Sequence, residues 1–312
     1  MDHASHSTLN PAGAAAEQIS QLFYWMLAGG IVIWGVVVGL AVYAIFVRKE
    51  HPLRMTRALV IGGGAVIPTV TLSGLMAYSL SIMPELHRPA PDGSLTIRVS
   101  GVRWWWRVEY LTDDGEVEFE TANEIRLPVD RPVEFKLVSE DVIHAFWIPA
   151  LGGKMDMIPG RENRLRLDPT KVGTYGGVCA EYCGTAHAQM MFRVIVSDEQ
   201  EFDAWRHQQR SDAIIEPASN PFGRQVFWRR GCPACHTIRG TEADGSVGPD
   251  LTHFGSRMTI GAGILPNESD ALKRWIVRTH RVKPGVEMPG FESLINAPVE
   301  LDALVAYLEA LR

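Results

Sequence analysis

The 312-residue sequence has no excess of basic residues: 30 lysines and arginines stand against 36 aspartates and glutamates, for a formal net charge of -6. This balance gives no reason to expect nucleic acid as a partner. Residues 1–18 lack the basic start and short apolar core of a cleavable signal peptide, so we expect a mobile N-terminal lead-in. Cysteine is scarce, and its 4 copies form two closely spaced pairs that indicate cofactor attachment, which leaves none for a structural disulfide.

Charged residues are absent from two long stretches, Ile19 to Val47 and Ala58 to Pro84. Each stretch exceeds the roughly 20 residues that a helix needs to cross a bilayer core. The sequence therefore predicts a transmembrane hairpin within residues 19–86, with helices over about 19–47 and 58–84.

The connector between these stretches is basic. It carries Arg48, Lys49, Arg54 and Arg57 against the single acid Glu50. Because basic connectors stay on the cytoplasmic side, we expect both termini, and everything after residue 85, to lie outside the cytoplasm.

Residues 93–198 follow a proline-rich joint and change to short segments in which apolar and polar side chains alternate. Such segments, separated by Gly, Pro and Asp, predict an antiparallel β-sandwich of Greek-key type. The predicted strands include 95–100, 117–121, 133–139 and 192–196.

One loop of this region concentrates soft metal ligands. Cys179, Cys183, His187 and Met190 fall within twelve consecutive residues, and His144 follows an upstream strand. Thiolate, imidazole and thioether suit copper, and a second thiolate favours a dinuclear centre over a mononuclear one. From the residues alone, a disulfide between the two cysteines and a copper-delivery site of thioredoxin fold remain alternatives.

Residues 199–216 predict a short amphipathic helix and a linker, and residues 217–312 change to a helical period. Helices are expected over 223–230, 269–280 and 298–311, which makes this domain all-α. Cys232-Pro-Ala-Cys235-His236 is the attachment motif of c-type haem, in which both thiols bond the haem and His236 binds the iron.

The loop from Cys179 to Met190 resembles the CuA site of subunit II of haem-copper cytochrome c oxidases, in which a glutamate stands between the cysteines, as Glu181 does here. The resemblance implies that the Glu181 carbonyl binds copper and that its carboxylate binds magnesium at the contact with subunit I. The implied ligands of the two copper ions are His144, Cys179, Glu181, Cys183, His187 and Met190.

The run Gly101-Val-Arg-Trp104-Trp105-Trp106 is similar to the family segment whose first tryptophan receives electrons, which implies that role for Trp104. We expect Trp105 and Trp106 to pack, although three consecutive strand residues face both sides, so that at least one should be exposed. Asp141 and Asp156 also match family positions, with Asp156 implied near the magnesium.

Met288 lies beside proline in a segment that resembles the distal loop of class I cytochromes c, which implies the second axial ligand. A methionine ligand raises the reduction potential of haem relative to a second histidine. Met258, His253 and His280 are the alternatives. Pro68 resembles the mid-helix proline of subunit II, but the carboxylate often found before it is missing, so any proton-path role of Glu50 stays open.

The whole chain thus resembles an oxidase subunit II of caa3 type: a transmembrane hairpin, an all-β cupredoxin-like domain and a fused class I cytochrome c domain. The resemblance implies electron delivery through haem c and CuA to subunit I, which reduces oxygen to water and pumps protons. No catalytic acid, base or nucleophile is then needed in this chain. A CuA-containing nitric oxide reductase, and less readily a membrane-anchored electron carrier or copper chaperone, are the alternative functions.

The implied location is the bacterial inner membrane, crossed more than once, with both cofactor domains on the periplasmic side. The implied partners are subunit I, subunit III, the lipid bilayer and an electron donor such as a cytochrome c or a quinol-cytochrome c reductase.

Overall fold

The computed structural model describes residues 7–47, 52–213 and 221–312. The chain divides into two compact units. One is the helical stretch Gln18–Arg88, and the other contains the N-terminal segment up to Glu17 together with Pro89–Arg312. Glu50, the acid of the basic connector, lies outside the described residues.

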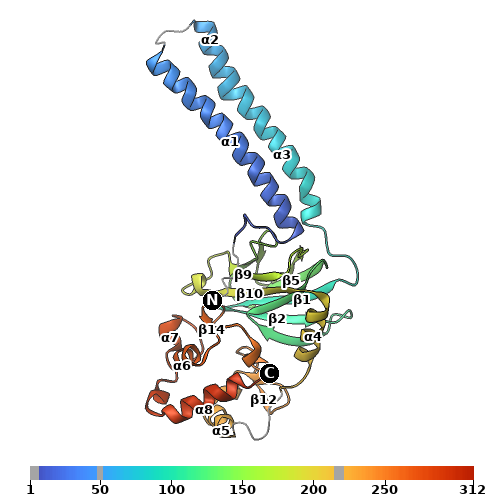
Figure 1. Cartoon of the computed structure of the whole chain (residues 1–312), viewed down its shortest axis with the longest axis vertical. Helices are drawn as coiled ribbons and strands as arrows, with labels where there is room; N and C mark the ends of the chain where they lie inside the picture. Colours follow the sequence, from blue (N-terminus) through green and yellow to red (C-terminus); the bar gives the residue numbers. More distant parts are fainter. Residues whose placement is uncertain (1–6, 48–51, 214–220) are drawn as a thin grey trace. The chain divides into compact units, whose positions relative to one another are not determined.

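The first unit is built from helices (Figure 1). α1 (Ala14–Phe46) is followed by a second helical run made of α2 (Leu53–Ala58), η1 (Leu59–Val66) and α3 (Ile67–Leu86). Over the part of the chain that the structure describes, these two runs are long and apolar enough to cross a membrane. Their apolar side chains, such as Trp34 and Val37, are exposed, as expected of side chains that face lipid or partner helices. The predicted pair of apolar helices is confirmed.

Pro68 lies in the first turn of α3, directly after the π-helical segment η1. Proline has no N–H group and its ring crowds the carbonyl four residues earlier, here that of Gly64. The wider π turn accommodates this local break without ending the helix.

The described part of the N-terminal lead-in, residues 7–17, is held against the sandwich instead of being mobile as we expected, while residues 1–6 lie outside the described residues. Ala12 is buried, and its backbone N–H donates to the Ala150 carbonyl at 2.7 Å. The Ala14 N–H donates to the Asp168 carbonyl at 3.0 Å. These backbone bonds do not depend on side-chain pattern, so the sequence carries little sign of them.

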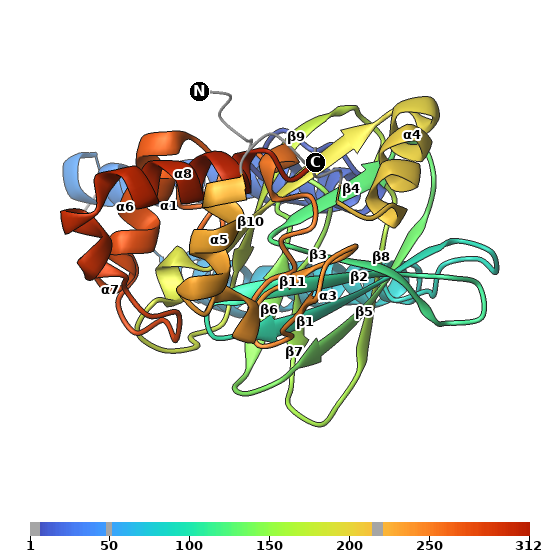
Figure 2. The ribbon, with the colours of Figure 1, turned by 90° about the horizontal axis from the view of Figure 1, so that it is seen from below.

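Residues 95–197 form a sandwich of two five-stranded sheets (Figures 1 and 2), with strand orders β3-β2-β1-β5-β8 and β4-β10-β9-β6-β7. Most neighbours are antiparallel, but β1 pairs with β5 and β4 with β10 in parallel, which corrects the purely antiparallel expectation. Strands that are not joined by a hairpin are free to pair in parallel. The bounds are β1 Leu95–Val102, β2 Trp105–Leu111, β3 Val117–Ala122, β4 Glu124–Pro128, β5 Val133–Ser139, β6 His144–Trp147, β7 Met155–Met157, β8 Asn163–Leu167, β9 Gly173–Cys179 and β10 Met191–Ser197.

The sandwich core is aromatic. The rings of Phe146 and Phe192 stack with centroids 4.8 Å apart, and Trp106 meets both rings edge-on. Gly177 faces this cluster, because a Cβ at Gly177 would lie 2.1 Å from the Phe192 ring. The packed aromatic layer holds β9 and β10 together. These two strands flank the segment from Cys179 to Met190, which is called the copper loop below.

α4 (Glu199–Arg210) follows the sandwich and is capped by Asp198, whose side chain accepts from the Glu201 N–H. The last domain is mainly helical, and its helices α5, α6 and α8 gather in one cluster (Figure 2). Its core forms where α5 packs on α8, with the Phe227 and Tyr307 rings 5.7 Å apart. The helical bounds are α5 Pro221–Arg229, η3 Cys232–Ala234, η4 Phe254–Ser256, α6 Ser269–Val277, α7 Thr279–Val282, η5 Glu292–Asn296 and α8 Pro298–Glu309.

Two details differ from the all-α expectation. Short ladders join β11 (Thr237–Ile238) to β12 (Ala243–Asp244) and β13 (Thr259–Ile260) to β14 (Leu265–Pro266). The helix expected over 269–280 is divided at Arg278 into α6 and α7.

Candidate copper and haem sites

The copper loop is closed by the pairing of its flanking strands. β9 ends at Cys179 and β10 begins at Met191, and these strands are antiparallel neighbours. The Cys179 N–H donates to the Met190 carbonyl at 2.9 Å, so the first and last side chains of the loop are brought together. β6, which neighbours β9, brings His144 to the same end of the sheet.

All the side chains expected to bind copper meet here. The Cys179 and Cys183 Sγ atoms lie 3.7 Å apart, farther than the roughly 2.05 Å of a disulfide. His144 Nδ1 lies 3.8 Å from Cys179 Sγ, and His187 Nδ1 lies 3.6 Å from Cys183 Sγ. Each thiol thus has its own imidazole.

Two further groups complete this donor set. Met190 Sδ lies 3.8 Å from Cys183 Sγ, and the Glu181 carbonyl oxygen lies 3.2 Å from Cys179 Sγ. The set of two cysteine thiols, two imidazole nitrogens, one methionine thioether and one backbone carbonyl suits copper. It also has the paired arrangement that a two-metal cluster would require.

Asp141 orients His144. The fully buried His144 ring donates from Nε2 to Asp141 Oδ1 at 2.8 Å, which directs Nδ1 at the thiols. Gly101 leaves room for this ring, since a Cβ there would lie 2.7 Å from it. Burial alone would raise the pKa of Asp141, but hydrogen bonds from His144 and from the backbone N–H groups of Val142 and Arg103 lower it. An ionised carboxylate behind a ligating histidine is a recurring support in metal sites.

The two thiols differ in acidity. The hydrogen bond with Cys183 lowers the pKa of Cys179 to about 3 against the opposing effect of burial, with help from His144. The same contact, together with burial, raises the pKa of Cys183. The contact thus favours the thiolate form of Cys179, and copper held by both sulfurs would release the proton of Cys183.

Glu181 and Asp156, the two acids implied near magnesium, lie on either side of Lys154. The Lys154 ammonium is 3.1 Å from Asp156 Oδ1 and 3.7 Å from Glu181 Oε2. All three side chains are close to half exposed. The structure thus gathers these carboxylates around one lysine.

Trp104 adjoins the copper loop. Its indole N–H donates to the Cys183 carbonyl at 2.9 Å, and its ring packs against Gly184 and Gly285. None of the three consecutive tryptophans is fully exposed: Trp104 and Trp106 are buried and Trp105 is half-buried. The expectation of an exposed tryptophan was wrong because the loop around Gly285, in the last domain, covers Trp104.

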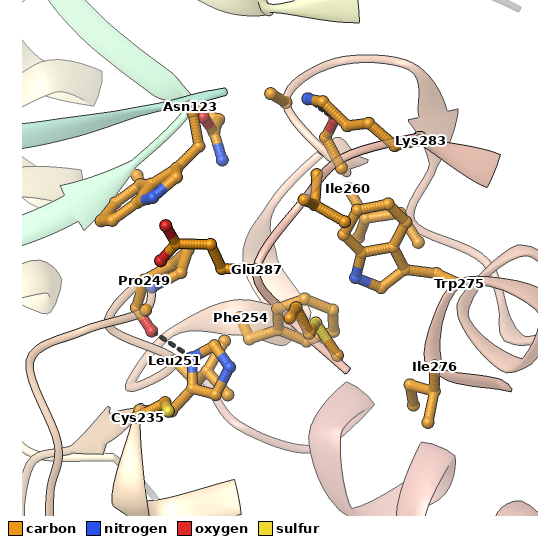
Figure 3. A pocket seen from close by; sticks show the side chains of 18 of the residues that line it. Asn123, Cys235, Pro249, Leu251, Phe254, Ile260, Trp275, Ile276, Lys283 and Glu287 are labelled. Carbon is orange, nitrogen blue, oxygen red and sulfur yellow. Dashed lines mark hydrogen bonds between the residues drawn. The ribbon is translucent and has the colours of Figure 1, made fainter. Parts of the chain in front are cut away.

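The haem motif opens onto one apolar cavity (Figure 3). Cys232, Cys235, His236 and Met288 all line it. His236 Nδ1 donates to the Pro249 carbonyl at 2.7 Å, which leaves Nε2 as the ligand atom. Burial lowers the pKa of His236, and the neutral ring that results is the form that binds metal. Other lining side chains are Phe254, Ile260, Trp275, Ile276, Phe291 and Leu308.

The alternative axial ligands lie elsewhere. His253 is buried and donates from Nε2 to the Ser211 carbonyl, while Met258 and His280 are exposed. None of these three is among the residues that line the cavity. An apolar cavity with two thiols, one oriented imidazole and one thioether fits haem c.

The cavity also reaches the copper domain, because Trp104, Trp105 and Asn123 are part of its lining. Trp104 is therefore shared: its indole nitrogen bonds to a loop cysteine and its ring borders the haem cavity. The sequence motifs did not show two residues of this contact, Gly285 and Lys283. Both lie in the segment that carries Met288, but neither is a ligand type in that segment and both are distant in sequence from their partners.

Replacement of Gly285 by alanine is expected to destabilise the contact around Trp104. Gly285 has φ +89°, and a Cβ there would lie 2.8 Å from the Trp104 ring. We expect a loss of about 1–3 kcal/mol, measured by scanning calorimetry of the purified chain. Gly93→Ala is the matched control, because Gly93 has φ +80° but open space around it. Equal losses in the two variants would show that the Trp104 contact contributes nothing.

Comparison with known proteins agrees with this architecture. The family model described as cytochrome c oxidase subunit II, periplasmic domain, matches residues 119–197, and the cytochrome c model matches residues 222–312. The cytochrome c oxidase subunit 2 of Alkalihalophilus pseudofirmus is 36% identical over 248 residues, covering 79% of this chain and 68% of that protein. The subunit 2 of Bacillus subtilis is 32% identical over 257 residues, covering 79% and 70%.

Among solved structures, the periplasmic domain of cytochrome oxidase subunit II from Bradyrhizobium japonicum is 32% identical, with a TM-score of 0.36 over 39% of this chain and 96% of that one. The two matched domains imply copper and haem c as cofactors, association with subunit I and a role in electron transfer. Identity above 30% across more than two thirds of its full-length relatives shows that this chain belongs to the cytochrome c oxidase subunit 2 family, with a cytochrome c domain fused behind the copper domain.

Proposed function

We propose that the chain accepts electrons at haem c, passes them by way of Trp104 to a dinuclear CuA centre and delivers them to subunit I, which reduces oxygen to water and pumps protons. One observation carries the internal part of this route. Trp104 borders the haem cavity and donates its N–H to the carbonyl of Cys183.

A dinuclear copper centre would supply one-electron chemistry with little rearrangement, because the charge is shared between two ions. The chain contributes the ligands. The thiols of Cys179 and Cys183 would bridge the two ions, and His144 and His187 would each bind one of them. Met190, fully buried beside Cys183, would be the weak axial ligand.

At haem c, Cys232 and Cys235 would hold the macrocycle covalently, and His236 and Met288 would bind the iron from opposite sides. The Pro249 carbonyl fixes the ring of His236. On the copper side, the Glu181 carboxylate would bind magnesium at the surface that meets subunit I, with Asp156 nearby and Lys154 displaced from between them.

The proposed orientation follows from the basic connector, of which Arg54 and Arg57 belong to the described α2. With that connector in the cytoplasm, both cofactor domains lie on the periplasmic side of the bacterial inner membrane. A cytochrome c or a quinol-cytochrome c reductase would supply electrons there, and subunit III would complete the complex. Tethering the haem domain replaces a diffusional encounter by a high effective concentration.

The proposal is tested on the purified oxidase by metal analysis, electron paramagnetic resonance and turnover. We expect two copper ions and one haem c in this chain, with a seven-line copper spectrum from one electron shared by two equivalent nuclei. Oxygen consumption should proceed from reduced haem c. A four-line copper spectrum would contradict the dinuclear centre, and turnover with nitric oxide in place of oxygen would contradict the assigned acceptor.

Met190→Leu is expected to leave copper bound but to change its reduction potential. Leucine conserves the volume of this buried side chain and removes only the thioether. We expect a shift of at least about 60 mV, equivalent to a tenfold change in a one-electron equilibrium, measured by redox titration. Met191→Leu is the control, since Met191 lies at the start of β10 outside the ligand set. Loss of copper from Met190→Leu would show that the thioether holds the metal instead of tuning it.

A further inference from the structure

Lys283 is a lysine without access to solvent. Its residue is 1% exposed, and it follows α7 on the loop that leads to Met288. In the cavity view it lies on the same side as Ile260 (Figure 3). Lysines are almost never this buried unless each donor has a partner.

The Lys283 ammonium has three acceptors. Nζ donates to the Trp104 carbonyl at 2.7 Å, to the Gln189 carbonyl at 2.8 Å and to the Gly261 carbonyl at 2.8 Å. An ammonium group has three N–H donors, so donors and acceptors match in number.

These three carbonyls come from separate parts of the molecule. Trp104 precedes β2, Gln189 belongs to the copper loop beside Met190, and Gly261 lies in the turn between β13 and β14 of the haem domain. The ammonium therefore joins the loop that carries Met288 to the copper loop and to the residue that borders both sites.

Backbone contacts beside it join the same surfaces. The Gln189 side-chain amide donates to the Val282 carbonyl at 3.1 Å. The Met191 N–H donates to the Ala262 carbonyl at 3.1 Å. Two further hydrogen bonds thus join haem-domain loops to the copper loop and to the start of β10 near Lys283.

Burial disfavours the charged form of this side chain and lowers the pKa of Lys283 to about 7. A cation removed from water is stabilised only when hydrogen bonds replace its hydration. Two of the three replacements, from Trp104 and Gln189, exist only while the haem domain contacts the copper domain. An apolar side chain would fill the space without this cost but would leave the carbonyls without the ammonium.

We infer that Lys283 is a positioning residue, whose ammonium fixes the Met288 loop against Trp104 and the copper loop and thereby sets the geometry for electron transfer from haem c to copper. The inference rests on the proposed function, since it presupposes electron transfer from haem c to copper. It assigns no role to Lys283 in binding either cofactor. It concerns only the contact between the two sites.

The test uses the assembled oxidase and a photoexcited reductant that injects one electron into haem c. Transfer to copper is followed by the absorbance of each cofactor at several solvent viscosities. In the wild-type protein we expect one phase that is independent of viscosity. Lys283→Met keeps most of the side-chain length but no donor, and we expect transfer at least roughly tenfold slower, because each charge-assisted hydrogen bond is individually worth about that factor. The slow phase should depend on viscosity, because the domains must then find their contact by diffusion.

Two more variants complete the experiment. Lys273→Met alters a partly exposed lysine of α6 in the same domain, which pairs with Asp302, and should transfer at the wild-type rate. Lys283→Arg keeps charge and donors in a larger side chain. A positioning role predicts faster transfer in Lys283→Arg than in Lys283→Met, whereas a packing role predicts the reverse.

The outcomes separate the inference from the proposal beneath it. Absence of haem-to-copper transfer in the wild-type oxidase would contradict the proposed function. Normal transfer in the wild type together with an unchanged, viscosity-independent rate in Lys283→Met would overturn the positioning role alone. Copper resonance and haem absorbance spectra must match the wild type in the variants compared. If Lys283→Met fails to load a cofactor, viscosity-independent transfer in Lys283→Arg supports the role and slow transfer in it overturns the role.

Discussion

Cys183→Ser is expected to remove the seven-line copper spectrum and to reduce oxygen turnover from haem c by more than about 100-fold. Cys183 contacts three other members of the donor set: its Sγ lies 3.7 Å from Cys179 Sγ, 3.6 Å from His187 Nδ1 and 3.8 Å from Met190 Sδ. Serine is a hard donor that stays protonated, so it cannot replace a bridging thiolate. Loss of an outer support of a metal site already costs roughly 10–100-fold, and loss of a bridge should cost more.

The loss of copper in Cys183→Ser can be distinguished from damage to the electron route, because the substitution leaves the main chain of residue 183 unchanged. The Trp104 N–H bonds to the carbonyl of Cys183, which the serine variant retains. Cys183 is also absent from the lining of the haem cavity, so the haem absorbance spectrum should not change. Asp141→Asn provides the graded comparison, because it alters the support of His144 and keeps every ligand. Two copper ions and seven lines in Cys183→Ser would disprove the thiolate bridge.

His236→Ala is expected to abolish normal haem ligation. The rate of electron transfer from haem c to copper should fall by at least about 100-fold, since axial ligands control a potential range of roughly 0.8 V. The ring of His236 is held by the Pro249 carbonyl and by close packing on Gly248, where a Cβ would lie 2.6 Å from it. His253 is not placed to replace it, because it does not line the haem cavity and its Nε2 donates to the Ser211 carbonyl. The low-spin spectrum of reduced haem should therefore disappear.

The matched control is His280→Ala, which removes an exposed histidine of α7 in the same domain. Its haem spectrum and turnover should equal those of the wild type. The copper spectrum should stay seven-line in both variants, because neither residue belongs to the copper donor set. An unchanged reduced-haem spectrum in His236→Ala would rule out His236 as the iron ligand.

The cofactor motifs were visible in the sequence because their ligands are held by local spacing. Cys232, Cys235 and His236 lie within five consecutive residues. Four of the five side chains expected to bind copper lie in the copper loop, which is flanked by two paired strands. His144 is the distant member, and it could be chosen only by its residue type and by family resemblance. The apolar helices were equally visible, because a long stretch without charge is typical of a helix that crosses a membrane.

Several strands were not predicted, for physical reasons that particular residues illustrate. β6 and β7 are too short to show alternation, and β9 contains Gly176 and Gly177, which disfavour strands in isolation. Gly177 is retained in β9 because the Phe192 ring occupies the place of a Cβ. Tertiary packing decides such positions, and the sequence of the strand alone does not carry that information.

The contact between the two cofactor domains was also beyond the sequence. Lys283 bonds to Trp104 across 179 positions of chain. A lysine beside proline and glycine suggests a solvated turn, and only the three carbonyls around it reveal its burial. The supporting role of Asp141 was hidden in the same way, since an acid three residues before a histidine is common in loops.

The cover over Trp104 has a consequence for competition between electron carriers. With its residue only 7% exposed beneath the loop of Gly285, the indole offers almost no surface to a diffusing protein while the fused domain is seated. Raising the concentration of a freely diffusing cytochrome should then saturate turnover at the rate set by the outer haem and never bypass it. A chain that ends before residue 217, and so lacks the haem domain, would leave the indole uncovered. Respiration in cells that carry this shortened chain should then depend directly on the abundance of soluble carriers.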